Sequence, residues 1–301
     1  MQLPKLPWLV LTPALVFVLV GIFAPLLMTH DPAGQDYTAI LQGPSFAHWL
    51  GTDYLGRDLW TRMIGGARTS LVAMAFVLVA ALSIGVVIGS LAGYVGGLAE
   101  TVLISLIDIA LALPSLVIAL ALMGVFSGEN FDWLSDYWKM ILALTLAWWA
   151  NYARMSRAVV VAELQQPYIE AARVMGASHL WIFIRHILPN VLGLVVVYAS
   201  ADAGALVLAI ATLSFLGLGV APPIPEWGQM LVDGMGYIED HPSLVIIPGL
   251  ALTAVVVSFN LLGEAFALQK VPRTLKGYAL SRKRRARKSE ELARLAEESR
   301  S

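Results

Sequence analysis

The chain has 301 residues, of which 58% are hydrophobic and only 14% are charged, and its formal net charge is −1. Soluble domains carry about 25% charged residues, so this composition excludes an ordinary soluble protein and indicates an integral membrane protein. The absence of cysteine excludes disulfide bonds, thiol nucleophiles and thiolate metal ligands. The five histidines are scattered along the sequence, and their spacing predicts no metal site: His30, His48, His179, His186 and His241.

Six apolar segments are each long enough to cross a bilayer as a helix, which takes roughly 20 residues. They are Trp8–Met28, Ser70–Tyr94, Thr101–Phe126, Met140–Val161, Val191–Gly217 and Leu244–Leu268. The first segment is too long for a signal peptide and lacks a small-residue cleavage site. The sequence therefore predicts an all-α integral membrane protein with six transmembrane helices.

The distribution of charge around these segments predicts their orientation. If the N-terminus is inside, sixteen of the twenty Lys and Arg residues lie on the inner side, whereas the outer loops are acidic. Positive charge is enriched in cytoplasmic segments, so we expect both termini in the cytoplasm. The expected units are a first helix at 1–28, an outer loop at 29–69, a five-helix core at 70–268 and a basic cytoplasmic tail at 269–301.

The outer loop contains a glycine-rich, charged segment that precedes the second apolar run. Its glycines permit tight turns, and its charged side chains are able to form ion pairs with one another. The candidate residues are Gly51, Thr52, Asp53, Gly56, Arg57 and Asp58, with Arg62 and Arg68 as further ionic partners. Two interpretations remain open: a surface that faces an external partner or the pore mouth, and a folded cap held by salt bridges.

Three features lie inside the predicted spans. Glycine recurs every fourth residue in the second span, which favours close helix packing. This stripe comprises Gly85, Gly89, Gly93 and Gly97. Pro114 is expected to kink the third span. Asp108 and Asp202 are ionisable groups within apolar segments, so they are candidates for the translocation path or for buried polar contacts.

The polar segment 163–190, between the fourth and fifth spans, predicts a pair of short helices outside the bilayer. Pro167 suits the first turn of a helix, where a missing N–H costs nothing. Gly176 is placed to end that helix, and Ser178 to cap the next one. A helix of roughly two turns would present small residues as a low surface that a partner can approach closely. These residues are Ala171 and Ala172.

This segment resembles the EAA loop of the membrane subunits of bacterial ABC importers. The residues that carry the likeness, in order and spacing, are Glu170, Ala171, Ala172, Gly176, Leu188 and Pro189. The outer block GTDYLGRD and the block at 214–228, SFLGLGVAPPIPEWG, are similar to motifs of the dipeptide, oligopeptide and nickel branch. Trp227 in the second block is expected at the outer membrane interface, where tryptophan is enriched. His186 and Glu264 depart from the family, which generally has Ile at the first position and usually Asp at the second. The resemblance extends from Trp49 to Gly263.

The resemblance implies a permease subunit of an ATP-driven importer in the inner membrane, with a coupling helix that docks on a cytoplasmic ATPase. The implied coupling residues are Tyr168, Glu170, Ala171, Ala172, Gly176 and Ala177, and the implied outer motif adds Pro225, Glu226 and Trp227. The implied partners are a second, different permease subunit, two ATPase subunits and an external solute-binding protein. The implied substrates are peptides, nickel or a related solute. The chain has no GxxxxGK[ST] loop, so we expect a non-catalytic subunit without a cofactor, whose partners bind ATP.

Two alternatives of a different class remain open. A secondary transporter or channel would use Asp108 and Asp202 as proton or ion sites and would need no ATPase. A membrane scaffold would recruit a partner through the basic cluster at 281–288. That cluster is also suited to anionic lipid headgroups. A solvated tail that helps to set the topology is the favoured interpretation, and nucleic-acid binding is not expected.

Overall fold

The structure is a computed structural model that describes residues 8–270, so the predicted basic cluster at 281–288 lies outside the described residues. The regular elements described are helices, as the sequence predicts. They are α1 (Trp8–Leu27), α2 (Leu59–Val95), α3 (Gly97–Leu111), α4 (Ser115–Phe126), η1 (Glu129–Phe131), α5 (Asp136–Leu164), α6 (Pro167–Val174), α7 (His179–Ile182), η2 (Phe183–Ile187), α8 (Leu188–Phe215), α9 (Trp227–Met235) and α10 (Ser243–Lys270).

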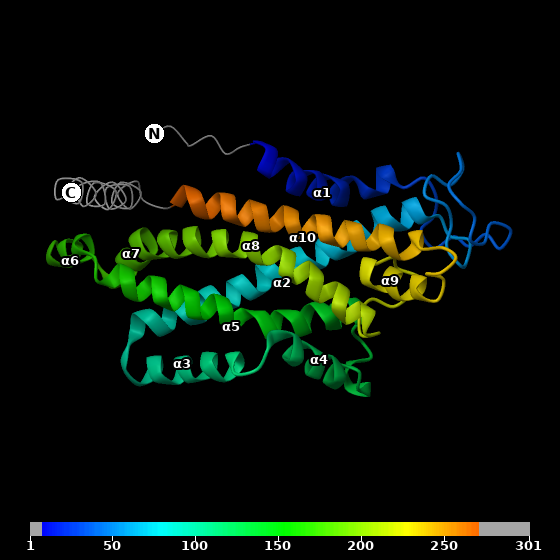
Figure 1. Cartoon of the computed structure of the whole chain (residues 1–301). Helices are drawn as coiled ribbons and strands as arrows, with labels where there is room; N and C mark the ends of the chain where they lie inside the picture. The colour runs from blue at the N-terminus through cyan, green and yellow to red at the C-terminus, as the bar shows by residue number, and fades with distance from the viewer. Residues whose placement is uncertain (1–7, 271–301) are drawn as a thin grey trace, which may run out of the picture.

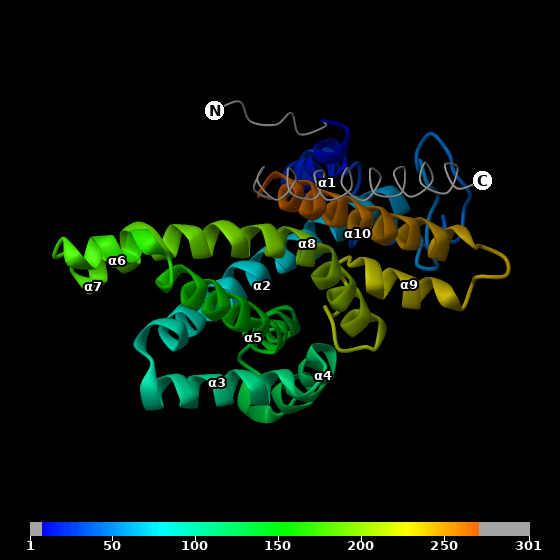
Figure 2. The same ribbon diagram turned by 60° about the vertical axis from the view of Figure 1, so that its left-hand side comes forward.

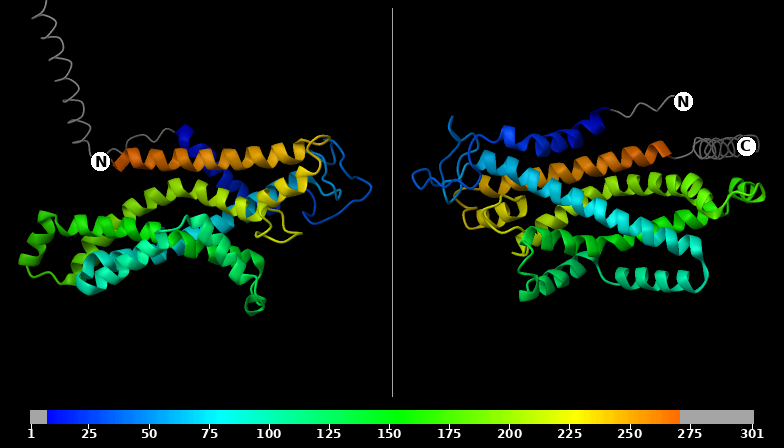
Figure 3. Two further views of the ribbon diagram at one scale, coloured as in Figure 1. Left: turned by 60° about the horizontal axis from the view of Figure 1, so that its bottom comes forward. Right: turned by 180° about the vertical axis from the view of Figure 1, so that it is seen from behind.

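The five long helices α1, α2, α5, α8 and α10 form an elongated bundle (Figure 1). The short helices α6 and α7 lie at one end of this bundle. The loop between α1 and α2 lies at the opposite end, together with α9, and both arrangements persist when the molecule is seen from behind (Figure 3). Helices α3 and α4 pack on the α5 side of the bundle, away from α1 and α10 (Figure 2).

Within residues 8–270, three helices are long and apolar enough to cross a membrane: Leu59–Val95, His179–Phe215 and Ser243–Ala267. The pair α3 and α4 becomes a fourth candidate if it is counted as one broken span, because the two helices are bent by 86°. The apolar part of α1, Leu11–Leu27, is shorter. The structure thus shows three or four candidate spans in an all-helical chain, and the count of six stays a prediction.

Pro114 has a larger effect than the kink that the sequence predicts. The expected continuous helix over Thr101–Phe126 is wrong, because α3 ends at Leu111 and α4 begins at Ser115 with Pro114 as its N-cap residue. Proline lacks the N–H needed for the helical hydrogen bond and its ring clashes with the preceding turn, so a break at this point is the expected consequence.

Helix α2 begins at Leu59, so residues 59–69, which we expected in the outer loop, are helical. The reason is a strong N-terminal cap: the Asp58 carboxylate accepts a 2.8 Å hydrogen bond from the backbone N–H of Thr61. This N-cap hydrogen bond fixes the point at which the outer loop ends and α2 begins.

Glycines allow α2 and α5 to lie in backbone contact, as the stripe predicts. A Cβ atom on Gly89 would lie 2.0 Å from the carbonyl oxygen of Ala153, and one on Gly85 would lie 2.5 Å from Cβ of Tyr152. Gly97 does not belong to this packing, because α2 ends at Val95 and Gly97 has open space around it. A similar close approach joins α8 to α10, where Gly263 lies against Ala201.

Candidate functional site

The segment between α5 and α8 contains a short helix with a well-defined stop. Gly176 adopts a φ of +84°, a left-handed conformation that favours glycine. The N–H of Ala177 donates a 3.0 Å hydrogen bond to the carbonyl oxygen of Ala172, and the N–H of Gly176 donates one of 3.0 Å to that of Arg173. This pair of bonds is the Schellman motif, which satisfies the carbonyl groups at a helix end. Ser178 then caps α7 through a 3.3 Å hydrogen bond from the N–H of Trp181.

The α6 end of the molecule exposes large apolar side chains. Val174 and Met175 are 84% and 81% exposed, and Tyr168 is also exposed. Glu170 and Ala171 are exposed as well. Scattered apolar side chains on a surface are ordinary, but a group of them at the tip of a short helix is typical of a contact with another protein.

Ala172 does not form part of the low surface that we expected. It is only 4% exposed and packs inward with the fully buried Ile169. In a helix, residues three apart lie on the same face, so this pair anchors α6 to the rest of the chain. The outward small residue is therefore Ala171 alone.

A groove of about 600 Å³ lies beside α6. Its lining includes Tyr168, Ala172, Met175, Ala177, Trp181 and His186. Tyr168 closes one side: its hydroxyl donates to Glu163 and accepts a 3.4 Å hydrogen bond from the amide of Asn190. Burial and the hydrogen bond to Glu163 raise the pKa of Tyr168 to about 12, so this hydroxyl remains a neutral donor at physiological pH.

The α6–α7 segment is attached directly to the membrane bundle. The Tyr94 hydroxyl, at the end of α2, donates a 2.8 Å hydrogen bond to the carbonyl oxygen of His179. The Tyr94 ring also meets Phe183 edge to face, with 5.3 Å between centroids. A displacement of α7 would therefore act on α2 without an intervening flexible linker.

The two candidate acids of the apolar segments each have a partner. Arg154 on α5 donates a 2.9 Å hydrogen bond to Asp108 on α3, and both side chains are exposed. The Tyr152 hydroxyl donates a 2.6 Å hydrogen bond to Asp202 on α8. Asp108 is therefore in an exposed ion pair, whereas Asp202 is in a largely buried polar contact.

The outer loop forms a folded cap, which we define as residues 29–58 with α9. Asp53 pairs with Arg57 at 2.6 Å and with Arg62 at 3.3 Å. Both guanidinium groups also reach Asp233 on α9, at 3.4 and 3.7 Å. Asp233 was not among the expected partners, because it follows in sequence long after the loop. Asp53, Arg57 and Arg62 are buried and Asp233 is half-buried, so these ion pairs join the loop, the start of α2 and α9.

The glycines and the threonine of the outer motif serve the same cap. A Cβ on Gly56, whose φ is +72°, would collide with the carbonyl oxygen of Asp36. A Cβ atom on Gly51 would lie 2.4 Å from the carbonyl oxygen of Gln42. The buried Thr52 hydroxyl accepts a 2.9 Å hydrogen bond from the N–H of Gln42. These contacts fold the loop back on itself.

The block that ends in Pro225, Glu226 and Trp227 packs into the start of α2. Glu226 caps α9 through a 3.0 Å hydrogen bond from the N–H of Gln229, and it accepts one of 3.1 Å from the Ser70 hydroxyl. Trp227 is 1% exposed. Its expected position at the membrane interface is therefore wrong, because it fills the space left by Gly66.

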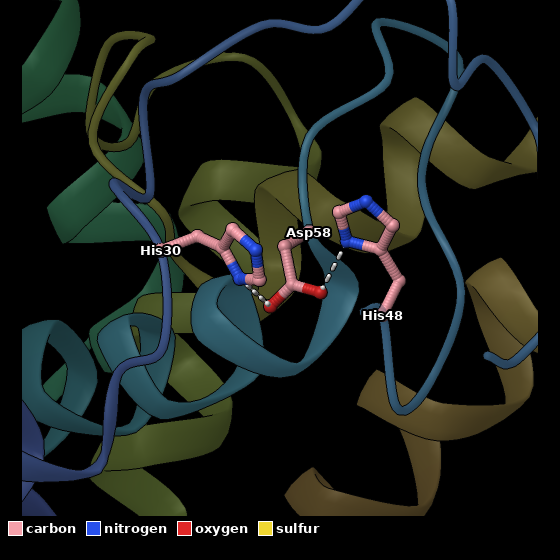
Figure 4. A group of neighbouring side chains, drawn as sticks. All are labelled: His30, His48 and Asp58. Atoms are coloured by element: carbon pink, nitrogen blue, oxygen red, sulfur yellow. Dashed lines mark hydrogen bonds and ion pairs between the residues drawn. The ribbon is translucent and has the colours of Figure 1, made fainter. Parts of the chain in front are cut away.

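Two expectations for the charged loop residues are also wrong. Arg68 is exposed and takes no part in the network of Asp53, Arg57 and Arg62. Asp58 contacts two histidines instead of an arginine: His48 at 3.0 Å and His30 at 3.7 Å. The spacing of the histidines in the sequence did not predict this cluster, because the loop brings together residues that are far apart in the chain (Figure 4).

Bundles of long apolar helices with polar ends define an integral membrane protein. A family model described as binding-protein-dependent transport system inner membrane component matches residues 85–275. The chain belongs to this family, whose members are non-catalytic membrane components of ABC importers.

Several curated relatives match most of the chain. The probable D,D-dipeptide transport system permease protein DdpC of Escherichia coli is 38% identical over 269 residues, which cover 86% of this chain and 88% of that protein. The glutathione transport system permease protein GsiD of Pectobacterium atrosepticum is 37% identical over 251 residues, covering 83% and 81%. The nickel transport system permease protein NikC of Escherichia coli is 35% identical over 257 residues, covering 83% and 90%.

Proposed function

We propose that α6 is the helix through which an ATPase subunit drives this permease. The observation that carries this proposal is the α6 tip, where Val174 and Met175 are exposed immediately before the helix stop at Gly176. The groove lined by Tyr168 and Trp181 offers an adjoining recess for a partner side chain. The Tyr94 contact joins α7, the helix that follows α6 in the chain, to the end of α2.

The proposed topology has six spans, formed by α1, α2, the α3–α4 pair, α5, α8 and α10. Both termini and α6 face the cytoplasm, and the folded cap faces outward. The start of α1, the end of α10 and α6 point to the same end of the bundle, which supports this orientation (Figure 1). The concentration of Lys and Arg on that side supports it independently. The four proposed units, 1–28, 29–69, 70–268 and 269–301, follow from this topology.

The proposed assembly contains a second permease subunit, two ATPase subunits and an external solute-binding protein. Helix α3 supports the second permease subunit, because Leu98, Val102 and Ile109 expose most of their apolar surface. Such a surface suits a neighbouring apolar helix or lipid. The folded cap supports the external partner, because buried ion pairs give it a fixed shape.

The proposed cargo is a short peptide. Three of the relatives are named for transport of D,D-dipeptide, dipeptide and glutathione, and one for nickel. Family membership favours this ATP-driven function over the secondary transporter considered from Asp108 and Asp202. Uptake of labelled dipeptide by cells with and without the chain is the direct measurement, with nickel uptake as the competing outcome.

The coupling role is tested by Glu170→Lys and Gly176→Pro. Proline fixes φ near −65°, so it is incompatible with the φ of +84° at Gly176. We expect both variants to reach the membrane but to lose uptake, because the ATPase subunits no longer dock on α6.

Two matched variants control this experiment. Gly176→Asn should retain most uptake, since Asn tolerates the left-handed conformation. Glu129→Lys makes the same charge change as Glu170→Lys at an exposed position in η1, remote from α6, and should transport normally. Normal uptake in both Glu170→Lys and Gly176→Pro would overturn the assignment of α6.

A further inference from the structure

Three side chains of the folded cap converge on one point (Figure 4). His30 follows α1, His48 belongs to the loop, and Asp58 caps α2. The Nδ1 atom of His48 lies 3.0 Å from Oδ1 of Asp58, and that of His30 lies 3.7 Å from Oδ2. One potential ligand atom from each residue falls within a cluster no wider than 4.8 Å, and the two rings lie 5.0 Å apart between centroids.

Asp58 is a buried carboxylate without a permanent cationic partner among residues 8–270. Asp58 is only 3% exposed. The nearby Arg57 and Arg62 are directed to Asp53 and Asp233, and its own ionic contacts in this part of the chain are the two histidines. A carboxylate removed from water needs compensation by positive charge and hydrogen bonds. The backbone at the start of α2 supplies one hydrogen bond from Thr61, but no full charge.

The position of His30 is not explained by a hydrogen bond to Asp58. A separation of 3.7 Å exceeds the range of an N–H···O hydrogen bond. The same Nδ1 atom lies 2.9 Å from the hydroxyl oxygen of Thr29, which is able to donate to a neutral imidazole. The His30 ring therefore lies beside the carboxylate without a hydrogen bond to it, and its Nδ1 atom would exchange the Thr29 hydroxyl for a metal ion.

We propose that His30, His48 and Asp58 bind a divalent transition-metal ion of the Zn²⁺ class. Two imidazoles and one carboxylate are a ligand set typical of zinc, whereas Mg²⁺ and Ca²⁺ prefer oxygen ligands alone. Zinc would bind at about 2.0–2.2 Å from each ligand atom, so the cluster must contract slightly around the ion. The fourth ligand would be water. The His30 side chain is 42% exposed, which gives the ion a route from solvent.

A bound ion would join three segments that are otherwise connected through the loop: the end of α1, the turn at His48 and the start of α2. It would also supply the positive charge that Asp58 lacks. The site lies in the folded cap and not between the apolar helices. The inference does not depend on α6 or on transport.

The test measures zinc bound to the full-length chain, purified in detergent through a tag that contains no histidine. The protein is stripped with chelator and dialysed against buffered micromolar Zn²⁺, and the metal is quantified by mass spectrometry. We expect about one ion per chain for the wild type and roughly tenfold or greater loss of affinity for His30→Ala and His48→Ala. His241→Ala removes another histidine from the same end of the molecule and should bind zinc like the wild type.

A second variant separates metal binding from folding. Asp58→Asn keeps a side chain that caps helices well but removes the negative charge. We expect it to elute from gel filtration like the wild type and to lose zinc. Co²⁺ substituted into the wild type should give the intense visible absorption of a four-coordinate site, absent from His48→Ala. Equal zinc content in the wild type and the doubly substituted His30→Ala/His48→Ala chain would overturn the proposal, as would failure of the wild type to retain zinc.

Discussion

The indole nitrogen of Trp227 donates a 3.1 Å hydrogen bond to the carbonyl oxygen of Met63, which lies 164 residues earlier in the chain. This contact joins the first residue of α9 to the first turns of α2. Both partners are buried, and the indole occupies the space that Gly66 leaves open. Two sequence motifs that are far apart in the chain therefore form one structural unit at the outer end of the bundle.

Loss of that hydrogen bond should destabilise the outer end of the molecule. Trp227→Phe removes the hydrogen-bond donor and part of a fully buried ring, so we expect a loss of about 1–3 kcal/mol. Thermal unfolding of the purified chain in detergent measures the effect. Trp133→Phe is the matched control, because the Trp133 indole makes an equivalent bond to Asn130 but is 78% exposed. Equal destabilisation by the two changes would contradict the packing role of Trp227.

The buried ion pairs should be sensitive to removal of one acid. Asp53→Asn leaves Arg57 and Arg62 with Asp233 as their shared acidic partner, so we expect destabilisation by about 3–5 kcal/mol. Chemical unfolding in detergent followed by circular dichroism checks this. Asp31→Asn changes an exposed acid in the same loop and should have little effect. A stable Asp53→Asn protein would show that the network contributes nothing to the cap.

Helix α2 should tolerate no side chain at Gly89. A Cβ there would lie 2.0 Å from the Ala153 carbonyl oxygen, and a backbone atom of a packed helix cannot move away cheaply. Gly89→Ala should therefore cost about 1–3 kcal/mol and lower the yield of folded protein in the membrane. Gly124→Ala, in open space on α4, should be neutral or slightly stabilising. Similar melting temperatures for both variants would contradict this account of the α2–α5 contact.

The acids in the apolar segments should not be essential for energising transport. Asp202→Asn retains an oxygen that accepts the hydrogen bond from Tyr152, and Asp108→Asn removes an exposed ion pair. We expect both variants to keep most uptake, and depletion of ATP to abolish uptake in the wild type. Transport that stops in either variant but survives ATP depletion would restore the secondary transporter.

Local signals predicted the segment at α6 well. Pro167 opens the helix, Gly176 provides the left-handed stop and Ser178 caps α7, since each of these effects acts within a few residues. The orientation of Ala172 was missed because the sequence does not reveal which face of a short helix packs inward. The general class, an all-helical membrane protein, followed from composition.

Contacts between segments that lie far apart in the sequence were not predicted from local sequence patterns. Asp233 completes the arginine network from α9, and His30 meets Asp58 across a folded loop. No periodicity or spacing in the sequence predicts either contact, because each depends on how the folded cap packs over α2. Trp227 was wrongly expected at a membrane interface for the same reason. The sequence around an aromatic residue beside prolines does not show whether its side chain is buried or exposed.

Docking of α6 on an ATPase is tested by copurification of the chain from native membranes in mild detergent. Mass spectrometry of the wild-type complex should identify ATPase subunits with a GxxxxGK[ST] loop and a second permease subunit. The Glu170→Lys and Gly176→Pro chains should retain the permease partner and lose the ATPases. Recovery of the wild-type chain without an ATPase, or equal ATPase recovery with both variants, would contradict the claim.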